Sequence, residues 1–120
     1  MNHIALGKEG EAAACSFLLR QGYQILARNY RRKCGEIDII AQKQNSIVFV
    51  EVKSRHSEKF GKPCEAVNWR KQKKIMQTAC LYLQSKGLLD VSLRFDIIEV
   101  YFLYEKIVKI QHLPDAFGEN

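Results

Sequence analysis

Two strand-like segments separated by a short polar turn constrain the fold of this chain more than any other feature. Residues 36–42 and 47–53 are rich in β-branched and apolar side chains, with charged residues two apart, and the polar residues 43–46 separate them. That pattern predicts a β-hairpin. The second segment is apolar on both faces until its charged end, which is typical of a central strand in a sheet.

The turn also predicts how the two strands of the hairpin pair. A two-residue loop at Gln44-Asn45 places Asp38 opposite Glu51. The same register places Glu36 opposite Lys53. Directly opposed side chains have β-carbons about 4.5–5.5 Å apart. A slip of one residue would change every partner, so this register is a hypothesis.

The two facing carboxylates have two interpretations. Like charges at that distance repel unless a shared proton or a bound cation compensates, so Asp38 and Glu51 mark a candidate cation site. The structural alternative is an exposed strand end at which Glu36 and Lys53 form a cross-strand ion pair, contributing roughly a few tenths of a kcal/mol. The residues alone leave both interpretations open.

Basic residues cluster on either side of the hairpin. The chain of 120 residues has a net charge of +6 and a pI of about 9.2. Residues 53–74 carry eight basic and two acidic side chains, which equals the whole net charge, and residues 20–33 carry five basic side chains and no acid. A polyanionic partner such as nucleic acid fits this distribution, and a solvated basic surface is the alternative.

The remaining residues predict two helices and three further strands. The expected elements, in chain order, are a helix over residues 4–21, a strand over 23–30, the hairpin, a helix over 65–86 ended by Gly87, and strands over 93–102 and 107–113. We expect a loop at the basic run 31–33 and a frayed tail from Pro114 onward. This αβββαββ order predicts one α/β domain over residues 1–120.

Helical periodicity assigns faces to the charged residues of both helices. In the first helix Glu11 falls on an apolar stripe with Cys15, Leu18 and Leu19, where an acid needs a partner, and a helix-end acid near solvent is the alternative. The expected buried stripe of the second helix consists of Trp69, Gln72, Met76, Ala79, Cys80 and Leu83. Its expected exposed basic face consists of Arg70, Lys73, Lys74 and Gln77, with Lys71 at the edge.

The sequence gives little support to a zinc site or a membrane protein. The four cysteines form no Cys-x-x-Cys pair and have no histidine at ligand spacing, so buried, reduced thiols are expected. Charged residues interrupt the N-terminus before an apolar signal segment could form, and no apolar run approaches about 18 residues. We therefore expect a cytoplasmic protein.

Four sequence blocks resemble one protein family. They are Gly35–Ile40, Val48–Arg55, Phe60–Val67 and Arg94–Asp96, and together they resemble the YraN-like family of uncharacterised bacterial proteins, over about Gly7 to Val100. That family is similar to the restriction-endonuclease-like fold and, within it, to archaeal Holliday-junction resolvases. The resemblance implies a PD-(D/E)XK nuclease domain, with a central mixed sheet of about five strands flanked by helices.

The motif of that fold is an aspartate, a spacer and then Asp/Glu-x-Lys. Asp38 and Glu51-Val52-Lys53 match it, and Glu11 matches the acid that many members carry on the first helix. Ile37 stands where the motif has a proline, a departure that is frequent among resolvase-like members.

The activity that the resemblance implies is metal-dependent hydrolysis of a phosphodiester. Asp38, Glu51 and the Val52 carbonyl would hold one or two Mg²⁺ (or Mn²⁺) ions. Lys53 would position or deprotonate the attacking water or stabilise the developing anion, and Glu11 would bind a metal through water or orient Lys53. The residues expected to contact the DNA backbone are Arg28, Arg31, Arg32, Arg55, Lys71 and Lys74.

A structure-selective DNA endonuclease acting in repair or recombination is therefore the leading expectation. Because the pattern offers phosphate contacts and little base readout, branched or otherwise non-B-form DNA is the expected partner. A nucleic-acid-binding protein that keeps the fold without robust catalysis is the first alternative, and an RNA-directed phosphodiesterase is the second. Resolvase-like proteins are often dimers, because two cuts need two sites, so the resemblance leaves a homodimer open.

Overall fold

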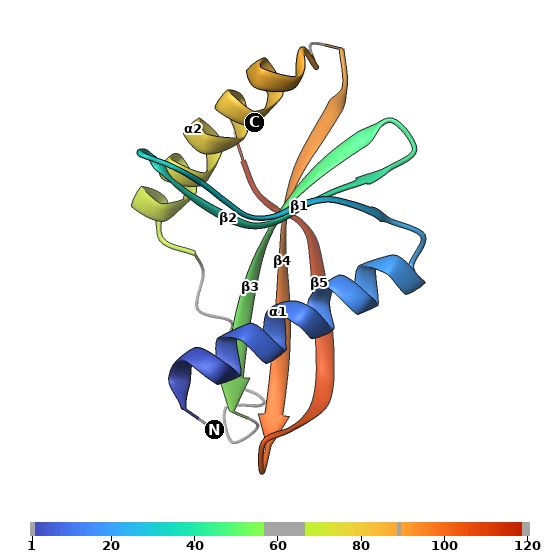
Figure 1. Ribbon diagram of the computed structural model, residues 1–120, viewed down its shortest axis with the longest axis vertical. Coiled ribbons are helices and arrows are strands. Elements are labelled where there is room, and N and C mark those ends of the chain that lie inside the picture. Colours follow the sequence, from blue (N-terminus) through green and yellow to red (C-terminus); the bar gives the residue numbers. More distant parts are fainter. Residues whose placement is uncertain (1, 57–66, 89, 119–120) are drawn as a thin grey trace.

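The computed structural model describes residues 2–56, 67–88 and 90–118. Its elements, shown in Figure 1, are α1 (His3–Arg20), β1 (Gln24–Arg32), β2 (Gly35–Lys43), β3 (Ser46–His56), α2 (Trp69–Lys86), β4 (Ser92–Leu103) and β5 (Lys106–Phe117). The predicted αβββαββ order is confirmed. None of the helices in these residues is long and apolar enough to cross a membrane.

All five strands belong to one mixed sheet. Neighbouring strands pair in chain order from β1 to β5. β3 runs parallel to β4, and the other three pairs are antiparallel. The parallel pair extends from Ser46↔Ser92 to His56↔Phe102, because the chain passes through α2 and returns to start β4 beside the start of β3. The expected mixed sheet with two helices is thus confirmed.

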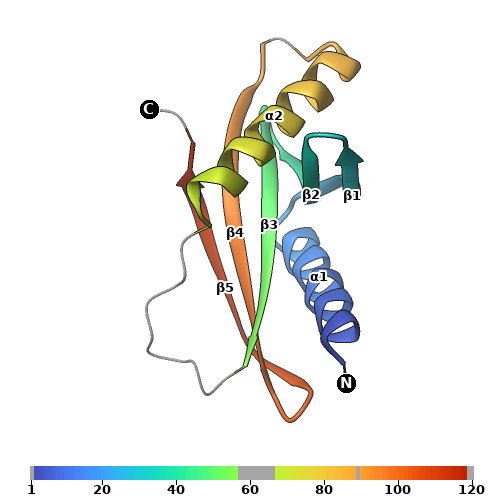
Figure 2. The same cartoon turned by 90° about the vertical axis from the view of Figure 1, so that its left-hand side faces the viewer.

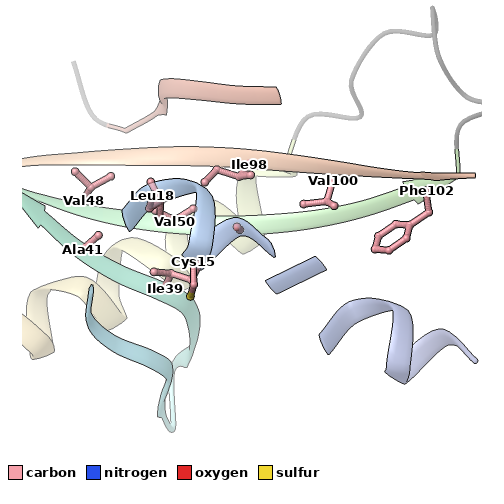
Figure 3. Packing of buried hydrophobic residues seen from close by; sticks show 10 residues of the cluster. Cys15, Leu18, Ile39, Ala41, Val48, Val50, Ile98, Val100 and Phe102 are labelled. Carbon is pink, nitrogen blue, oxygen red and sulfur yellow. The ribbon is translucent and has the colours of Figure 1, made fainter. Parts of the chain in front are cut away.

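β3 lies in the centre of the sheet and carries apolar residues on both faces, as predicted. Val48 and Val50 pack with α1 in one cluster, which Figure 3 shows from close by. Ile47 and Phe49 pack with α2 in a second cluster. Because successive side chains of a strand point to opposite faces, the two helices cover opposite faces of the sheet (Figures 1 and 2).

A close approach between α1 and β3 brings the first helix to the end of the hairpin. The Asn2 side chain caps the helix by accepting a hydrogen bond from the Ala5 N–H at 2.8 Å. A β-carbon added at Gly10 would overlap Ser54 Oγ of β3, so only glycine fits at this crossing without displacing Ser54. The next residue, Glu11, therefore lines a pocket with the last residues of β3.

α2 differs from its prediction in its start and in its buried face. The helix begins at Trp69 and ends at Gly87 as predicted, while residues 65–66 of the expected range lie outside the described residues. Trp69 is 66% exposed, and Cys80 is also exposed. The buried residues are instead Ile75, Thr78, Ala79 and Tyr82. The predicted stripe was wrong because it started from the large ring of Trp69, whereas the sheet receives the adjacent stripe of the helix.

Two strands next to the hairpin turns are longer than predicted. β1 continues through Arg31 and Arg32, which pair with Glu36 and Gly35, so only Lys33-Cys34 forms the turn that was expected to be a basic loop. β3 continues to His56 along its parallel pairing with β4. The rest of the expected loop that follows, residues 57–63, and Cys64 lie outside the described residues.

The C-terminal strand also extends beyond its prediction. β5 runs to Phe117, so the expected frayed tail from Pro114 is wrong. The Asp115 N–H donates to Asp96 Oδ1 at 2.9 Å, and the Phe117 ring stacks on Phe95 with ring centroids 5.3 Å apart. These contacts join the end of β5 to β4. On α1, Leu19 was also placed wrongly, because it is exposed.

Candidate functional site

The β2–β3 ladder ends where the two predicted acids begin. Its pairs follow the predicted register from Lys43↔Ser46 to Ile39↔Val50. Asp38 and Glu51 are the next residues on their strands. The Val52 N–H donates a hydrogen bond to Asp38 Oδ2 at 2.8 Å, so this carboxylate contacts β3 at the point where β2 leaves it.

The alternative Glu36–Lys53 ion pair is not formed in the described part of the chain. Glu36 pairs with Arg31 in the β1–β2 ladder, and Arg31 Nη2 lies 3.2 Å from Glu36 Oε1. Lys53 faces Glu99 across the parallel β3–β4 ladder. The cross-strand interpretation of these charges was therefore wrong.

A pocket of about 670 Å³ opens at the end of the hairpin. It lies between the first half of α1 and the last residues of β3, and residues of β2 and α2 complete its wall. Its ionisable lining residues are His3, Lys8, Glu11, Asp38, Glu51, Lys53, Arg55, His56 and Lys71. Acidic and basic groups from four elements thus meet in one pocket, and all four predicted catalytic residues are among them.

Asp38 has a strongly perturbed carboxyl group. Burial and the neighbouring Glu51 raise the pKa of Asp38 from 3.8 to about 7, although the Val52 N–H and the charge of Lys71 oppose this change. At neutral pH the ionised form of Asp38 therefore lacks full compensation. A proton or a cation would supply it, as the facing carboxylates predicted.

Glu11 points toward the same pocket, as its place on the apolar stripe predicted. Its side chain is 15% exposed, and Arg28 Nη2 of β1 lies 3.8 Å from its Oε1. That buried oxygen accepts no hydrogen bond from the described residues. Burial raises the pKa of Glu11, and the nearby Arg28 charge opposes the rise. Glu11 therefore offers an oxygen with unused capacity to accept a hydrogen bond.

Two lysines face these acids and are held in different states. Lys71 Nζ of α2 lies 2.5 Å from Glu51 Oε1. Burial alone would lower the pKa of Lys71, but its hydrogen bond to Glu51 outweighs burial and the pKa is raised. Burial, together with the charge of Lys71, lowers the pKa of Lys53. Lys71 is thus fixed as a cation, while Lys53 loses its proton more easily than an ordinary lysine.

The donor set at this site fits a hard divalent cation. Asp38 and Glu51 offer carboxylate oxygens, and Val52 offers a carbonyl on the same edge, because a strand residue directs its N–H and carbonyl to the same neighbour. In residues 2–56, 67–88 and 90–118 no three His, Cys, Asp or Glu side chains lie close enough to bind one ion, so Glu11 is not a third direct ligand. Few protein oxygens with retained water are typical of Mg²⁺ sites.

The two basic clusters that were predicted to contact DNA meet in the structure. Gly35, beside the β1–β2 turn, packs against Lys74 of α2. A second pocket of about 370 Å³ lies at this contact and is lined by Arg70, Lys71 and Lys74 among others. Lys71 lines both pockets and so stands between the acidic site and the basic one.

The predicted DNA-contacting residues differ in their availability. The Arg31 side chain is 74% exposed and that of Arg28 is 46% exposed, although each has an acidic neighbour. Arg32 donates to the Tyr30 hydroxyl at 2.9 Å. Arg55 is mostly buried, and its Nε lies 2.7 Å from a carboxylate oxygen of Glu99. Arg55 therefore has a clear structural role besides the predicted contact.

Two buried acids of β4 were missed by sequence reasoning. Glu99 is fully buried beside Arg55. Asp96 is also fully buried, and Arg94, His112 and the Asp115 N–H surround its carboxylate. In both cases an acid interrupts an apolar strand, which was the available signal, but the partners come from other strands and could not be assigned from spacing.

Comparison with known proteins identifies relatives along most of the chain. The model of Uncharacterised protein family UPF0102 matches residues 10–100. A UPF0102 protein of Clostridioides difficile is 48% identical over 98% of this chain and 100% of its own length. UPF0102 proteins of Alkaliphilus metalliredigens and Caldanaerobacter subterraneus subsp. tengcongensis are 47% and 46% identical, covering 94% and 98% of this chain and 97% and 98% of their own lengths. The family resemblance drawn from the sequence blocks is confirmed.

Proposed function

The chain belongs to the uncharacterised protein family UPF0102, and from this premise we propose that it is a metal-dependent DNA endonuclease with a restriction-endonuclease-like fold. The observation that carries the proposal is the meeting of Asp38, Glu51 and Lys53 where β2 leaves β3. Their spacing matches the motif of that nuclease fold. The mixed sheet with a helix on each face is compatible with the same fold.

Mg²⁺ or Mn²⁺ is the proposed cofactor, held by Asp38, Glu51 and the Val52 carbonyl. When bound, such an ion lowers the pKa of a coordinated water and neutralises charge on the scissile phosphate. Lys53 lines the same pocket with a lowered pKa, so it is suited to exchange a proton with the attacking water. Glu11, with its unused buried oxygen, orients a water or Lys53.

Branched or flapped DNA is the proposed substrate, in repair or recombination. The basic residues of β1 and α2 lie beside the acidic pocket, where they contact the phosphate backbone on either side of the scissile bond. Contacts of this kind position DNA and carry little sequence information. Selectivity then comes from the shape of the DNA.

A nucleic-acid-binding role without catalysis is the second candidate. The observation that favours it is the ion pair between Lys71 and Glu51, which already neutralises one of the two metal-binding carboxylates. If no divalent ion displaces that ammonium, the basic surface would bind DNA while the acidic site stays inactive.

A cleavage assay separates the two candidates. Purified protein is incubated with four-way junction, flap, nicked and linear duplex DNA in Mg²⁺, Mn²⁺ or EDTA, alongside Asp38→Asn, Lys53→Ala and, as a matched control, Lys106→Ala at the distant β4–β5 turn. We expect metal-dependent cutting of a branched substrate that both site variants lose and the control keeps. Binding without cutting in every metal would reject the endonuclease in favour of the binding protein.

A further inference from the structure

The acidic pocket contains a basic side chain in direct contact with one of the metal-binding carboxylates. Lys71 belongs to the first turn of α2, and its Nζ lies 2.5 Å from Glu51 Oε1. The Glu51 side chain is only 7% exposed. A buried carboxylate without a counter-ion is strongly unfavourable, so this contact stabilises the metal-free protein.

Acidic and basic side chains balance in this pocket. The three acids are Glu11, Asp38 and Glu51, and the three neighbouring bases are Arg28, Lys53 and Lys71. A divalent ion on Asp38 and Glu51 would add two positive charges beside the Lys71 ammonium. Two unit charges about 4 Å apart already interact by about 4 kcal/mol at an effective dielectric constant of 20, so the ion and the ammonium compete for Glu51.

The geometry points to Lys71 as an internal counter-ion of Glu51 that a divalent metal ion replaces. This inference rests on the metal site of the proposed function. It adds that the metal-free site is neutralised by the chain itself, and that metal binding includes the release of one ion pair. Lys71 therefore lowers the affinity of the site for metal.

The structure gives the displaced side chain a route out of the acidic pocket. The Lys71 side chain is 45% exposed, and it also lines the basic pocket with Arg70 and Lys74. Its backbone is held independently, because the Lys71 N–H donates to the capping side chain of Asn68 at 2.9 Å. The exchange thus needs only rotation of the lysine side chain, and α2 does not have to move.

Calorimetric titration with Mn²⁺ alone tests the inference without any substrate. We expect Lys71→Gln to bind Mn²⁺ about tenfold more tightly than the wild type, which equals about 1.4 kcal/mol. Lys71→Arg, which keeps the charge, should stay within about threefold of the wild type. Lys73→Gln removes the same charge from the same helix but from a side chain that lies over the Trp69 ring, so it should leave the affinity unchanged.

Thermal unfolding in EDTA and in saturating Mn²⁺ covers the case in which Lys71→Gln folds poorly. If Mn²⁺ restores a variant that is unfolded in EDTA, the metal has taken the place of the ammonium and the inference is supported. A variant that stays unfolded in Mn²⁺ overturns it.

The outcomes of the titration distinguish this inference from the proposed function. Equal affinities for the wild type and Lys71→Gln would overturn the counter-ion role, while the metal site and the nuclease proposal would stand. Binding by Lys71→Gln alone would support the inference in its strongest form. Absence of Mn²⁺ binding in the wild type, Lys71→Gln and Lys71→Arg would overturn both proposals.

Discussion

Replacement of Asp38 by asparagine is expected to stabilise the metal-free protein, although it removes a residue of the candidate site. The asparagine oxygen can still accept the hydrogen bond from the Val52 N–H, which is 2.8 Å long in the native chain. The substitution removes the negative charge that Glu51 and burial make unfavourable. It also supplies an amide donor next to the Glu51 carboxylate.

The pKa of Asp38 sets the size and the pH dependence of this effect. The carboxyl group ionises near 3.8 in an unfolded chain and at about 7 in the folded protein. The folded state therefore keeps a proton that the unfolded state has lost, so the contribution of Asp38 to stability falls as the pH rises from about 4 to about 7. At about 1.4 kcal/mol per pKa unit the ceiling is about 4 kcal/mol. Because the pocket opens to solvent, we expect a gain of about 1–2 kcal/mol at pH 8.

Urea unfolding in EDTA, at pH 5 and at pH 8, measures the gain. Asp96→Asn on β4 is the matched control, because Asp96 is a buried aspartate whose charge is fully compensated. Burial alone would raise the pKa of Asp96, but hydrogen bonds with His112, Arg94 and the Asp115 N–H outweigh it and lower the pKa. Here the same substitution should cost about 3–5 kcal/mol. A loss of stability in Asp38→Asn at pH 8, or a gain of equal size at pH 5 and pH 8, would refute the reasoning.

Four further predictions follow from other contacts. Arg55→Ala should lower the free energy of unfolding by about 3–5 kcal/mol, because it removes the ion pair of the fully buried Glu99; a loss below about 1 kcal/mol in urea unfolding would contradict this. Gly10→Val should cost about 1–3 kcal/mol in the same assay, because the new side chain overlaps Ser54, and unchanged stability would mean that α1 can move away from β3. Phe117→Ala should cost about 1–2 kcal/mol through its stacking on Phe95, whereas a frayed C-terminus would show no loss. Mn²⁺ should raise the melting temperature more at pH 8 than at pH 6, because the metal must displace the proton that Asp38 retains below about pH 7; an equal shift at both pH values would argue against Asp38 as a ligand.

The hairpin and the pairing of its strands were predictable because the signals are local. The two-residue loop at Gln44-Asn45 sets the register, and the alternation of side chains on both sides of the loop agrees with it. The register then placed Asp38 beside the end of β3 correctly. It could not indicate where the ladder stops, because β2 leaves β3 to remain paired with β1, and that pairing depends on distant residues.

The parts that were predicted less well depend on tertiary contacts. Trp69 has the largest apolar side chain of α2, yet it begins the helix and remains exposed, since the sheet is covered by the next stripe. The last residues of β5 are ordered through Asp96, which the sequence does not link to them. The Lys71–Glu51 ion pair joins a helix to a strand, and helical periodicity alone placed Lys71 at the edge of the exposed face.

The site exists because β3 has two different edges over the same residues. Toward β4 its ladder continues without a break to His56↔Phe102, which holds Glu51 and Lys53 in a rigid frame. Toward β2 the ladder stops at Ile39↔Val50, so the other edge of β3 is free to meet a carboxylate and the open pocket. Continued pairing on that side would satisfy the backbone but would fill the space in which the charged groups meet. The position at which β2 leaves β3 therefore decides where the fold can carry an incompletely compensated carboxylate such as Asp38.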